Sequence, residues 1–228
     1  MILELLMAVT TAVALDKLLK REYPWLKTII MQGGTLRQKY PEIISKTKQV
    51  FFHQIAAFVL FQTSPLIIYT YASLTLVAVY GNYMLIITGV TLLMDALLRS
   101  INAGVGSLVA EGDKERIKKV FWELTSLRLW LASVVCFGIY KLGHSFIILW
   151  VGNDFLLEQS AFIVLIAITF IGLSRTNDTF LAAYGLFQDV WAPVTEAVLN
   201  LGLSILLGYY YGLTGILSGV LISLLVIV

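Results

Sequence analysis

The chain has 228 residues, of which 59% are hydrophobic and 13% are charged, and its net charge at pH 7 is +2. A soluble domain carries about 25% charged residues, so this composition excludes a soluble globular domain and a disordered chain. The small net charge gives no reason to expect a nucleic-acid partner. A membrane-spanning helix needs about 20 apolar residues, and we therefore expect an all-α transmembrane bundle of about seven spans.

Seven apolar stretches follow one another along the chain, with charged or turn residues between them. Their ranges are 1–19, 50–71, 74–110, 120–140, 157–184, 191–210 and 213–228. The first and the last are short for a crossing, and the third is longer than a crossing needs. The connector 20–48 is the most polar part of the chain, and Pro24, Gly33, Gly34 and Pro41 interrupt it.

The basic residues are concentrated in two connectors. The chain has 16 Lys and Arg residues. The first connector and the end of the preceding span hold Lys17, Lys20, Arg21, Lys27, Arg37, Lys39, Lys46 and Lys48; the second connector holds Lys114, Arg116, Lys118 and Lys119. The loops on the other side hold only Lys141. Short loops rich in Lys and Arg stay on the cytoplasmic side, so this pattern predicts that both connectors are cytoplasmic.

Polar residues recur at helical spacing within three of the expected spans. The third span carries Thr88, Thr91, Asp95, Arg99 and Asn102; the fifth carries Thr169, Gly172, Arg175 or Thr176, and Thr179; the sixth carries Glu196, Asn200 and Ser204. Charged residues within a membrane usually face a partner or a water-filled space. Three helices with one polar face each predict a shared hydrated path. The alternative is that these polar stripes are packing contacts between helices.

Local pairs offer the charges within the spans a way to neutralise each other. Asp95 and Arg99 are four residues apart, and Arg175 and Asp178 are three apart. Both spacings place opposite charges on one helix face. Arg128 lies close to the basic turn that precedes the fourth span, so we expect its long side chain to reach the membrane interface.

Signatures of catalysis are missing from the sequence. His53 and His144 have no Cys, Asp or Glu at the spacing of metal ligands. The sequence also has no phosphate-binding glycine loop and no nucleophile motif. We therefore expect no metal, no cofactor and no enzymatic activity.

Four runs carry a family resemblance. They are QTSPLIIYTYASLTLVAVYGNYMLI (62–86), NAGVGSLVAEGDKERIKKVFWEL (102–124), FIILWVGNDFLL (146–157) and AAYGLFQDVWAPVTEAVLN (182–200). In this order they resemble the C-terminal half of Wzx-like polysaccharide and O-antigen flippases, of the multidrug/oligosaccharidyl-lipid/polysaccharide exporter superfamily. The resemblance implies one lobe of a two-lobed alternating-access transporter. Residues 1–48 would be the last helix of an N-terminal lobe with a basic cytoplasmic connector, and residues 49–228 a C-terminal six-helix lobe with a truncated last helix.

The implied function is movement of an oligosaccharide on undecaprenyl pyrophosphate across the bacterial cytoplasmic membrane. Arg99 and Arg175 are then candidates for contact with the pyrophosphate, because guanidinium groups bind phosphate well, and Asp95 and Asp178 for counter-ions or protonation sites. The candidates to line the path are Thr88, Thr91, Asn102, Glu196 and Asn200. The expected partners are the lipid-linked oligosaccharide, the N-terminal lobe, the bilayer and the polysaccharide polymerase machinery.

Two other functions remain open. A drug or metabolite cation antiporter of the same superfamily would need an acidic path, and the charges within the spans do not decide between the two cargoes. A non-transporting membrane subunit of a polysaccharide assembly complex would use the loop around 150–154 and the basic connector as docking surfaces. A membrane glycosyltransferase or polymerase is a more distant alternative, because the outer loops are short.

Overall fold

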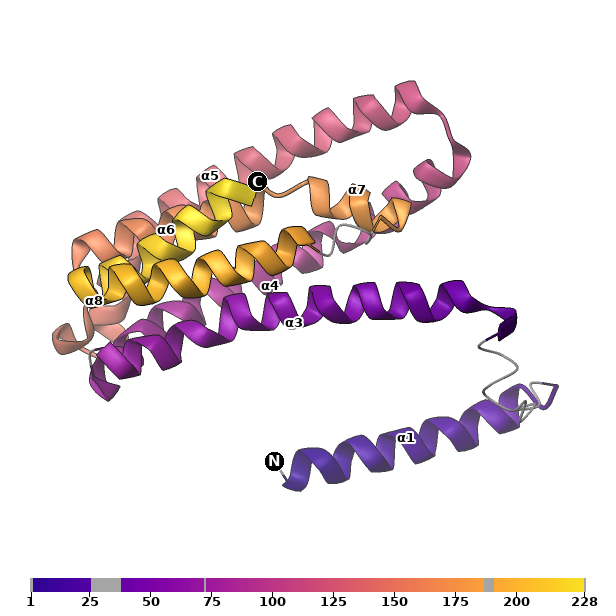
Figure 1. Cartoon of the computed structure of the whole chain (residues 1–228), viewed down its shortest axis with the longest axis horizontal. Coiled ribbons are helices and arrows are strands. Elements are labelled where there is room, and N and C mark those ends of the chain that lie inside the picture. The colour runs from indigo at the N-terminus through magenta and orange to yellow at the C-terminus, as the bar shows by residue number, and fades with distance from the viewer. Residues whose placement is uncertain (1, 26–37, 72, 187–190, 228) are drawn as a thin grey trace. The chain divides into compact units, whose positions relative to one another are not determined.

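The structure is a computed structural model that describes residues 2–25, 38–71, 73–186 and 191–227. The middle of the expected basic connector, with Lys27 and Arg37, lies outside the described residues. The described part is helical and contains no strand. Its elements are α1 (Ile2–Glu22), α3 (Pro41–Tyr71), α4 (Leu74–Glu111), α5 (Lys114–Trp150), the short 3-10 helix η1 (Asn153–Phe155), α6 (Gln159–Ser174), α7 (Asn177–Tyr184) and α8 (Trp191–Ile227) (Figure 1).

The chain divides into two compact units, Met1–Ile44 and Ser45–Val228. The first unit contains α1, on whose surface Lys20 Nζ pairs with Asp16 Oδ2 at 2.7 Å. The second unit contains most of α3 and all later helices. The division falls close to the boundary expected after Lys48. That the first unit is the last helix of an N-terminal lobe stays a prediction.

Four helices in the described residues are long and apolar enough to cross a membrane: Leu74–Glu111, Lys114–Trp150, Gln159–Tyr184 and Trp191–Val226. The all-α membrane fold is therefore confirmed, but this count is lower than the seven spans expected. One reason is that the sixth and seventh expected spans form one bent element, α8. The first and second expected spans correspond to α1 and α3, which contain side chains outside the described set.

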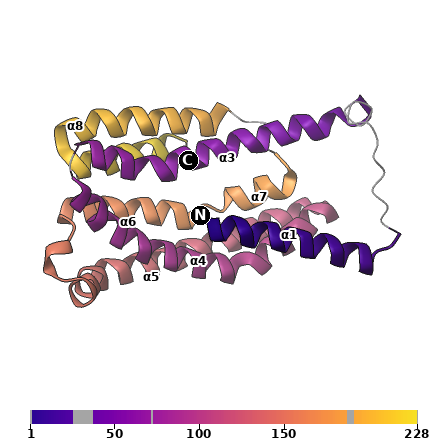
Figure 2. The same ribbon diagram turned by 90° about the horizontal axis from the view of Figure 1, so that it is seen from below.

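The second unit is a bundle in which α6 packs against both α5 and α8, while α4 packs against α5 and α7 (Figure 2). Its largest apolar core contains the fully buried side chains of Tyr83, Ile147, Phe162, Ile216 and Leu217. Smaller cores, built around Ala132 and around Phe180, continue along the bundle. The outer faces carry many exposed large apolar side chains, which hydrocarbon can cover at no cost in hydration.

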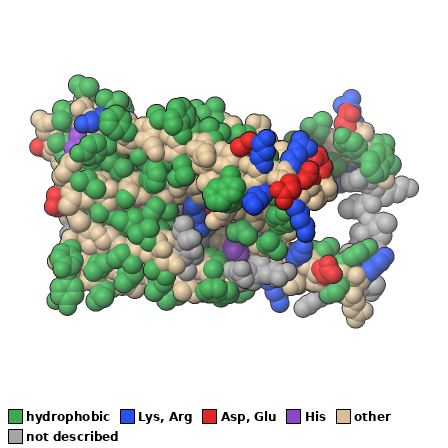
Figure 3. All heavy atoms as spheres, turned by 90° about the horizontal axis from the view of Figure 1, so that it is seen from above, with side chains coloured by type: hydrophobic (Ala, Val, Ile, Leu, Met, Phe, Trp, Pro, Cys, Tyr) green, Lys and Arg blue, Asp and Glu red, His purple; other side chains and the backbone are tan. Residues whose placement is uncertain are grey.

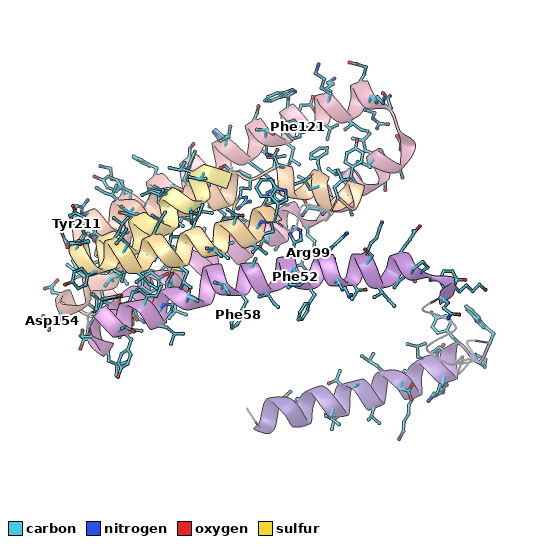
Figure 4. All side chains as sticks on the ribbon, viewed as in Figure 1. Phe52, Phe58, Arg99, Phe121, Asp154 and Tyr211 are labelled. Carbon is cyan, nitrogen blue, oxygen red and sulfur yellow. The ribbon has the colours of Figure 1, made fainter. Side chains whose placement is uncertain are left out.

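Charged side chains gather at one end of the α4–α8 bundle (Figure 3). The turn from α4 to α5 lies there, and Asp113 Oδ1 accepts the Arg116 backbone N–H at 3.1 Å to cap the start of α5. Arg116 Nη1 pairs with Glu111 Oε2 at 3.0 Å. The C-terminal end of α3 and the bend of α8 lie at the opposite end, as do Asp154 and Tyr211 (Figure 4). The two ends thus differ in charge, as expected of a membrane protein.

Helix α8 bends back on itself at Gly212, whose φ of 57° and ψ of −137° are not helical. The two arms then run side by side, and Ser204 Oγ donates to the Ile216 carbonyl at 3.0 Å. Glycines make this close approach feasible, because a Cβ on Gly219 would lie 2.5 Å from the Ser204 backbone N. A Cβ on Gly215 would collide with the Leu207 carbonyl. Gly215 and Gly219, which are four residues apart in the last expected span, therefore pack against the preceding arm.

We expect Gly219→Ala to destabilise the protein by about 1–3 kcal/mol, because the backbone of the facing arm must shift to admit the methyl group. Gly202→Ala is the matched control: it lies on the same helix, and nothing lies within 4 Å of an added Cβ. There the substitution should be neutral or stabilise by up to about 1 kcal/mol. Thermal unfolding of the purified variants in detergent measures both. Equal melting temperatures would contradict the close packing of the two arms.

Candidate functional site

A cavity of about 510 Å³ opens among α3, α4, α6 and α8. Its apolar wall includes Met84, Ile87, Leu165 and Val220. Its polar lining comes from every one of these elements and from the start of α7: His53, Gln54, Ser64, Thr91, Thr169, Arg175, Asp178 and Glu196. An apolar pocket with a few convergent polar groups is the usual form of a ligand site.

Three charged side chains form a cluster in the cavity wall. Arg175 Nε lies 3.2 Å from Asp178 Oδ2, and Arg175 Nη1 lies 3.8 Å from Glu196 Oε1. The side-chain exposures are 29% for Arg175, 58% for Asp178 and 5% for Glu196. The local pair of Arg175 and Asp178 is confirmed. Arg175 also joins two elements far apart in the sequence, because Glu196 comes from α8.

A break in the candidate span Gln159–Tyr184 positions two members of this cluster. Helix α6 ends at Ser174, Arg175 is extended with φ −66° and ψ 97°, and α7 begins at Asn177. The run from Ser174 to Asp178 is polar, whereas α6 before it is apolar, and such short polar residues compete with the helix for backbone hydrogen bonds. Broken helices occur in membrane proteins where irregular backbone is buried in protein or lines a cavity. Here the break contributes Arg175 and Asp178 to the cavity.

Arg128 of α5 holds the other side of this break. Its Nη1 donates to the Arg175 carbonyl at 2.8 Å, and its Nη2 donates to Thr179 Oγ1 at 2.9 Å and to Asn102 Oδ1 at 3.4 Å. Thr179 Oγ1 also donates to Asn102 Oδ1 at 3.3 Å. These partners hold its guanidinium group among α4, α5 and the α6–α7 break. That its long side chain reaches the membrane interface stays a prediction.

The path residues predicted from sequence are only partly brought together. Thr91, Arg175, Asp178 and Glu196 line the cavity, as do Thr169 and Gly172 of the same predicted faces. Thr88, Asp95, Arg99 (Figure 4) and Asn102 are exposed on α4 and are not part of the cavity wall.

Asn200, Asp95 and Arg99 lie outside the cavity wall and have other surroundings. Asn200 is fully buried one turn beyond Glu196, and neither amide atom has a hydrogen-bond partner among the described residues. Within the part of the chain that the structure describes, Asp95 and Arg99 do not form the ion pair that their spacing permits. Asp95 instead lies close enough to Arg128 for an electrostatic interaction.

Sequence reasoning missed the role of Arg128 and the cavity positions of His53 and Ser64. For His53 the sequence shows only that no metal ligand lies at a suitable spacing, and it gives no signal that places Ser64 at a site. No sequence pattern could have joined either to Glu196, since only packing brings α3 and α8 to one cavity. In the described ranges, no group of three His, Cys, Asp or Glu side chains could hold a metal ion.

Comparisons of the chain with family models, with curated proteins and with solved structures found no match.

We expect Arg175→Gln to destabilise the protein by up to about 3 kcal/mol, because it leaves the buried Glu196 carboxylate without its cation. Asp178→Asn should cost less, since Asp178 is more than half exposed. Glu196→Gln in the Arg175→Gln background should recover most of the loss, because no isolated charge then remains. Thermal unfolding of the single and double variants forms a double-mutant cycle that checks this. Strictly additive effects would show that Arg175 and Glu196 do not interact.

Proposed function

We propose that this chain is part of a flippase that moves a lipid-linked oligosaccharide, carried on undecaprenyl pyrophosphate, across the bacterial cytoplasmic membrane. The observation that carries the proposal is the cavity within a membrane-type helix bundle, with ionic groups in one part of its wall and both apolar and uncharged polar side chains over the rest. The sequence resemblance to Wzx-like flippases points to the same cargo.

The chemistry of the cavity matches the head of such a lipid. Arg175 offers a forked donor for phosphate oxygens. Ser64, Thr91 and Thr169 line the same cavity, and hydroxyl groups can hydrogen-bond to sugar. Thr169 Oγ1 already donates to the Leu165 carbonyl at 2.8 Å, so it has only acceptor capacity left. A volume of about 510 Å³ suits the pyrophosphate and the nearest sugar, while the polyprenyl chain stays in the bilayer.

The bundle ends support an orientation. The first turns of α3 in the second unit and the α4–α5 turn lie at the same end (Figures 1 and 2). Lys46 and Lys48 belong to these turns of α3, and the α4–α5 turn is basic. We place this end in the cytoplasm, because basic loops are retained there. In this proposal the first unit ends an N-terminal lobe, which supplies the opposite wall of the path, and the polymerase machinery receives the product on the other side.

A cation antiporter of the same superfamily is the second candidate. Its support is the charge of the cavity wall, where Asp178 and Glu196 outnumber the single Arg175. A lipophilic cation would be attracted to this excess of carboxylate, whereas a pyrophosphate would need Arg175 to be released from it. The two candidates therefore predict opposite ligand preferences.

We expect Arg175→Ala to weaken binding of a short-chain prenyl pyrophosphate disaccharide about 10- to 100-fold, because a charge-assisted hydrogen bond to the phosphate is lost. Fluorescence titration of the purified protein in nanodiscs measures the affinity, with tetraphenylphosphonium as the cationic probe. Arg116→Ala is the control, since it removes the same charge at the exposed α4–α5 turn. Arg99→Ala tests whether the path extends beyond the cavity over the exposed face of α4.

The outcomes separate the two candidates. Tight cation binding that Glu196→Gln abolishes, with no binding of the pyrophosphate lipid, would establish the antiporter instead. Binding of neither probe would reject transport through this cavity. If Arg175→Ala and Arg116→Ala weaken pyrophosphate binding equally, the effect is one of overall charge and the assignment of Arg175 fails.

A further inference from the structure

The α6–α7 break is a place where backbone carbonyls lie inside a membrane-type helix without the usual helical donors. Three carbonyls around it accept side-chain hydrogen bonds: Ile171 from Ser174 Oγ at 3.0 Å, Ser174 from Thr176 Oγ1 at 3.4 Å, and Arg175 from Arg128 Nη1 at 2.8 Å. The first two bonds are local. The third comes from another helix and is the one with a charged donor, which makes it the strongest of the three.

The Arg175 residue is thereby held from two sides. Its carbonyl is bound by Arg128 of α5, and its guanidinium group lies in the cavity beside Asp178 and Glu196. Arg128 itself is not part of the cavity wall. The backbone of the break therefore links Arg128 to the side chain that Arg175 presents to the cavity.

We propose that Arg128 is a positioning residue, which fixes the α6–α7 break so that Arg175 presents its side chain to the cargo in the cavity. The bond to Thr179 Oγ1 extends the same hold to the first turns of α7. The bond to Asn102 Oδ1 anchors the arrangement on α4. One guanidinium group thus ties both halves of a broken helix to their neighbours.

The other charged groups around Arg128 are consistent with this role. Asp178 and Asp95 both lie close enough for electrostatic interaction with it, so its charge is balanced although it forms no ion pair with another residue that the structure describes. Lys cannot replace this function, because its ammonium group lacks the planar fork that reaches several acceptors at once. Arg175, which lines the cavity, and Arg128, which holds the break, are thus two different residues in different environments.

The first test needs no assumption about the cargo. Thr176 is 3% exposed within the break, and a Thr176→Cys variant reports its opening through the rate of maleimide labelling in nanodiscs. We expect Arg128→Gln to raise this rate at least about tenfold, because the bonds from a charged donor are lost. Cys136 on α5 is the internal control, since it is buried against α6 and bonds to the Ile166 carbonyl at 3.8 Å. Peptide mass spectrometry distinguishes the two thiols.

Matched variants keep this test decisive. Arg116→Gln removes the same charge at the exposed turn and should leave both thiols unchanged. Thr179→Val keeps Arg128 and removes one acceptor, so it should raise labelling by a smaller factor even if Arg128→Gln fails to fold. Faster labelling of both thiols would show general loosening and overturn the proposal. Equal rates at Thr176→Cys with and without Arg128 would overturn it as well.

The second test rests on the proposed function. Arg128→Gln should weaken binding of the pyrophosphate lipid in the otherwise native chain and add nothing in an Arg175→Ala background, because both act through one group. Losses that multiply would show that Arg128 acts independently of Arg175. Should the lipid not bind at all, the proposed function fails, and the labelling rates still decide whether Arg128 holds the break.

Discussion

Backbone carbonyls in a membrane interior must find donors within the protein, since no water is there to supply them. The span Gln159–Tyr184 is interrupted at Arg175 and Thr176, and donors from Ser174, Thr176 and Arg128 occupy the carbonyls around the interruption. The rest of the site follows from that arrangement. Because the carbonyl of Arg175 is held toward α5, its side chain faces α8, where Glu196 is buried. The cavity receives its ionic groups at this point and remains apolar over much of its wall.

The charges of the bundle fall into two sets with different surroundings. At the charged end, ion pairs such as Arg116 with Glu111 are exposed, and such pairs contribute little to stability. Within the bundle, Arg175 and Arg128 are partly shielded and are joined to carboxylates, hydroxyls or carbonyls from other elements. The first set suits a protein that must keep one end in water. The second set places polar groups in the interior of the bundle, beside its apolar cores.

The sequence was sufficient where the information is local. Apolar runs predicted α4 and α5, and the spacing of Arg175 and Asp178 predicted their pairing. It was insufficient where partners come from different helices: the contact of Arg175 with Glu196 and the cavity on α3, α4, α6 and α8 depend on packing. The hydrogen-bond partners of Arg128 likewise come from other helices and from the α6–α7 break. The expected span began at residue 120, whereas α5 begins at Lys114, which puts Arg128 about 20 Å along the helix and within reach of α7. The spacing of Asp95 and Arg99 permits an ion pair, but spacing alone does not determine whether the pair forms.

The bend of α8 at Gly212 has a mechanical consequence. Glu196 belongs to the first arm, while Leu217, Val220 and Leu224, which line the same cavity, belong to the second. At Gly215 and Gly219 the two arms are in direct backbone contact, with no side chain between them. Closely packed interiors transmit strain. The two arms of α8 therefore form one rigid part of the cavity wall. A ligand must either fit the space that both arms already enclose or move the two arms together.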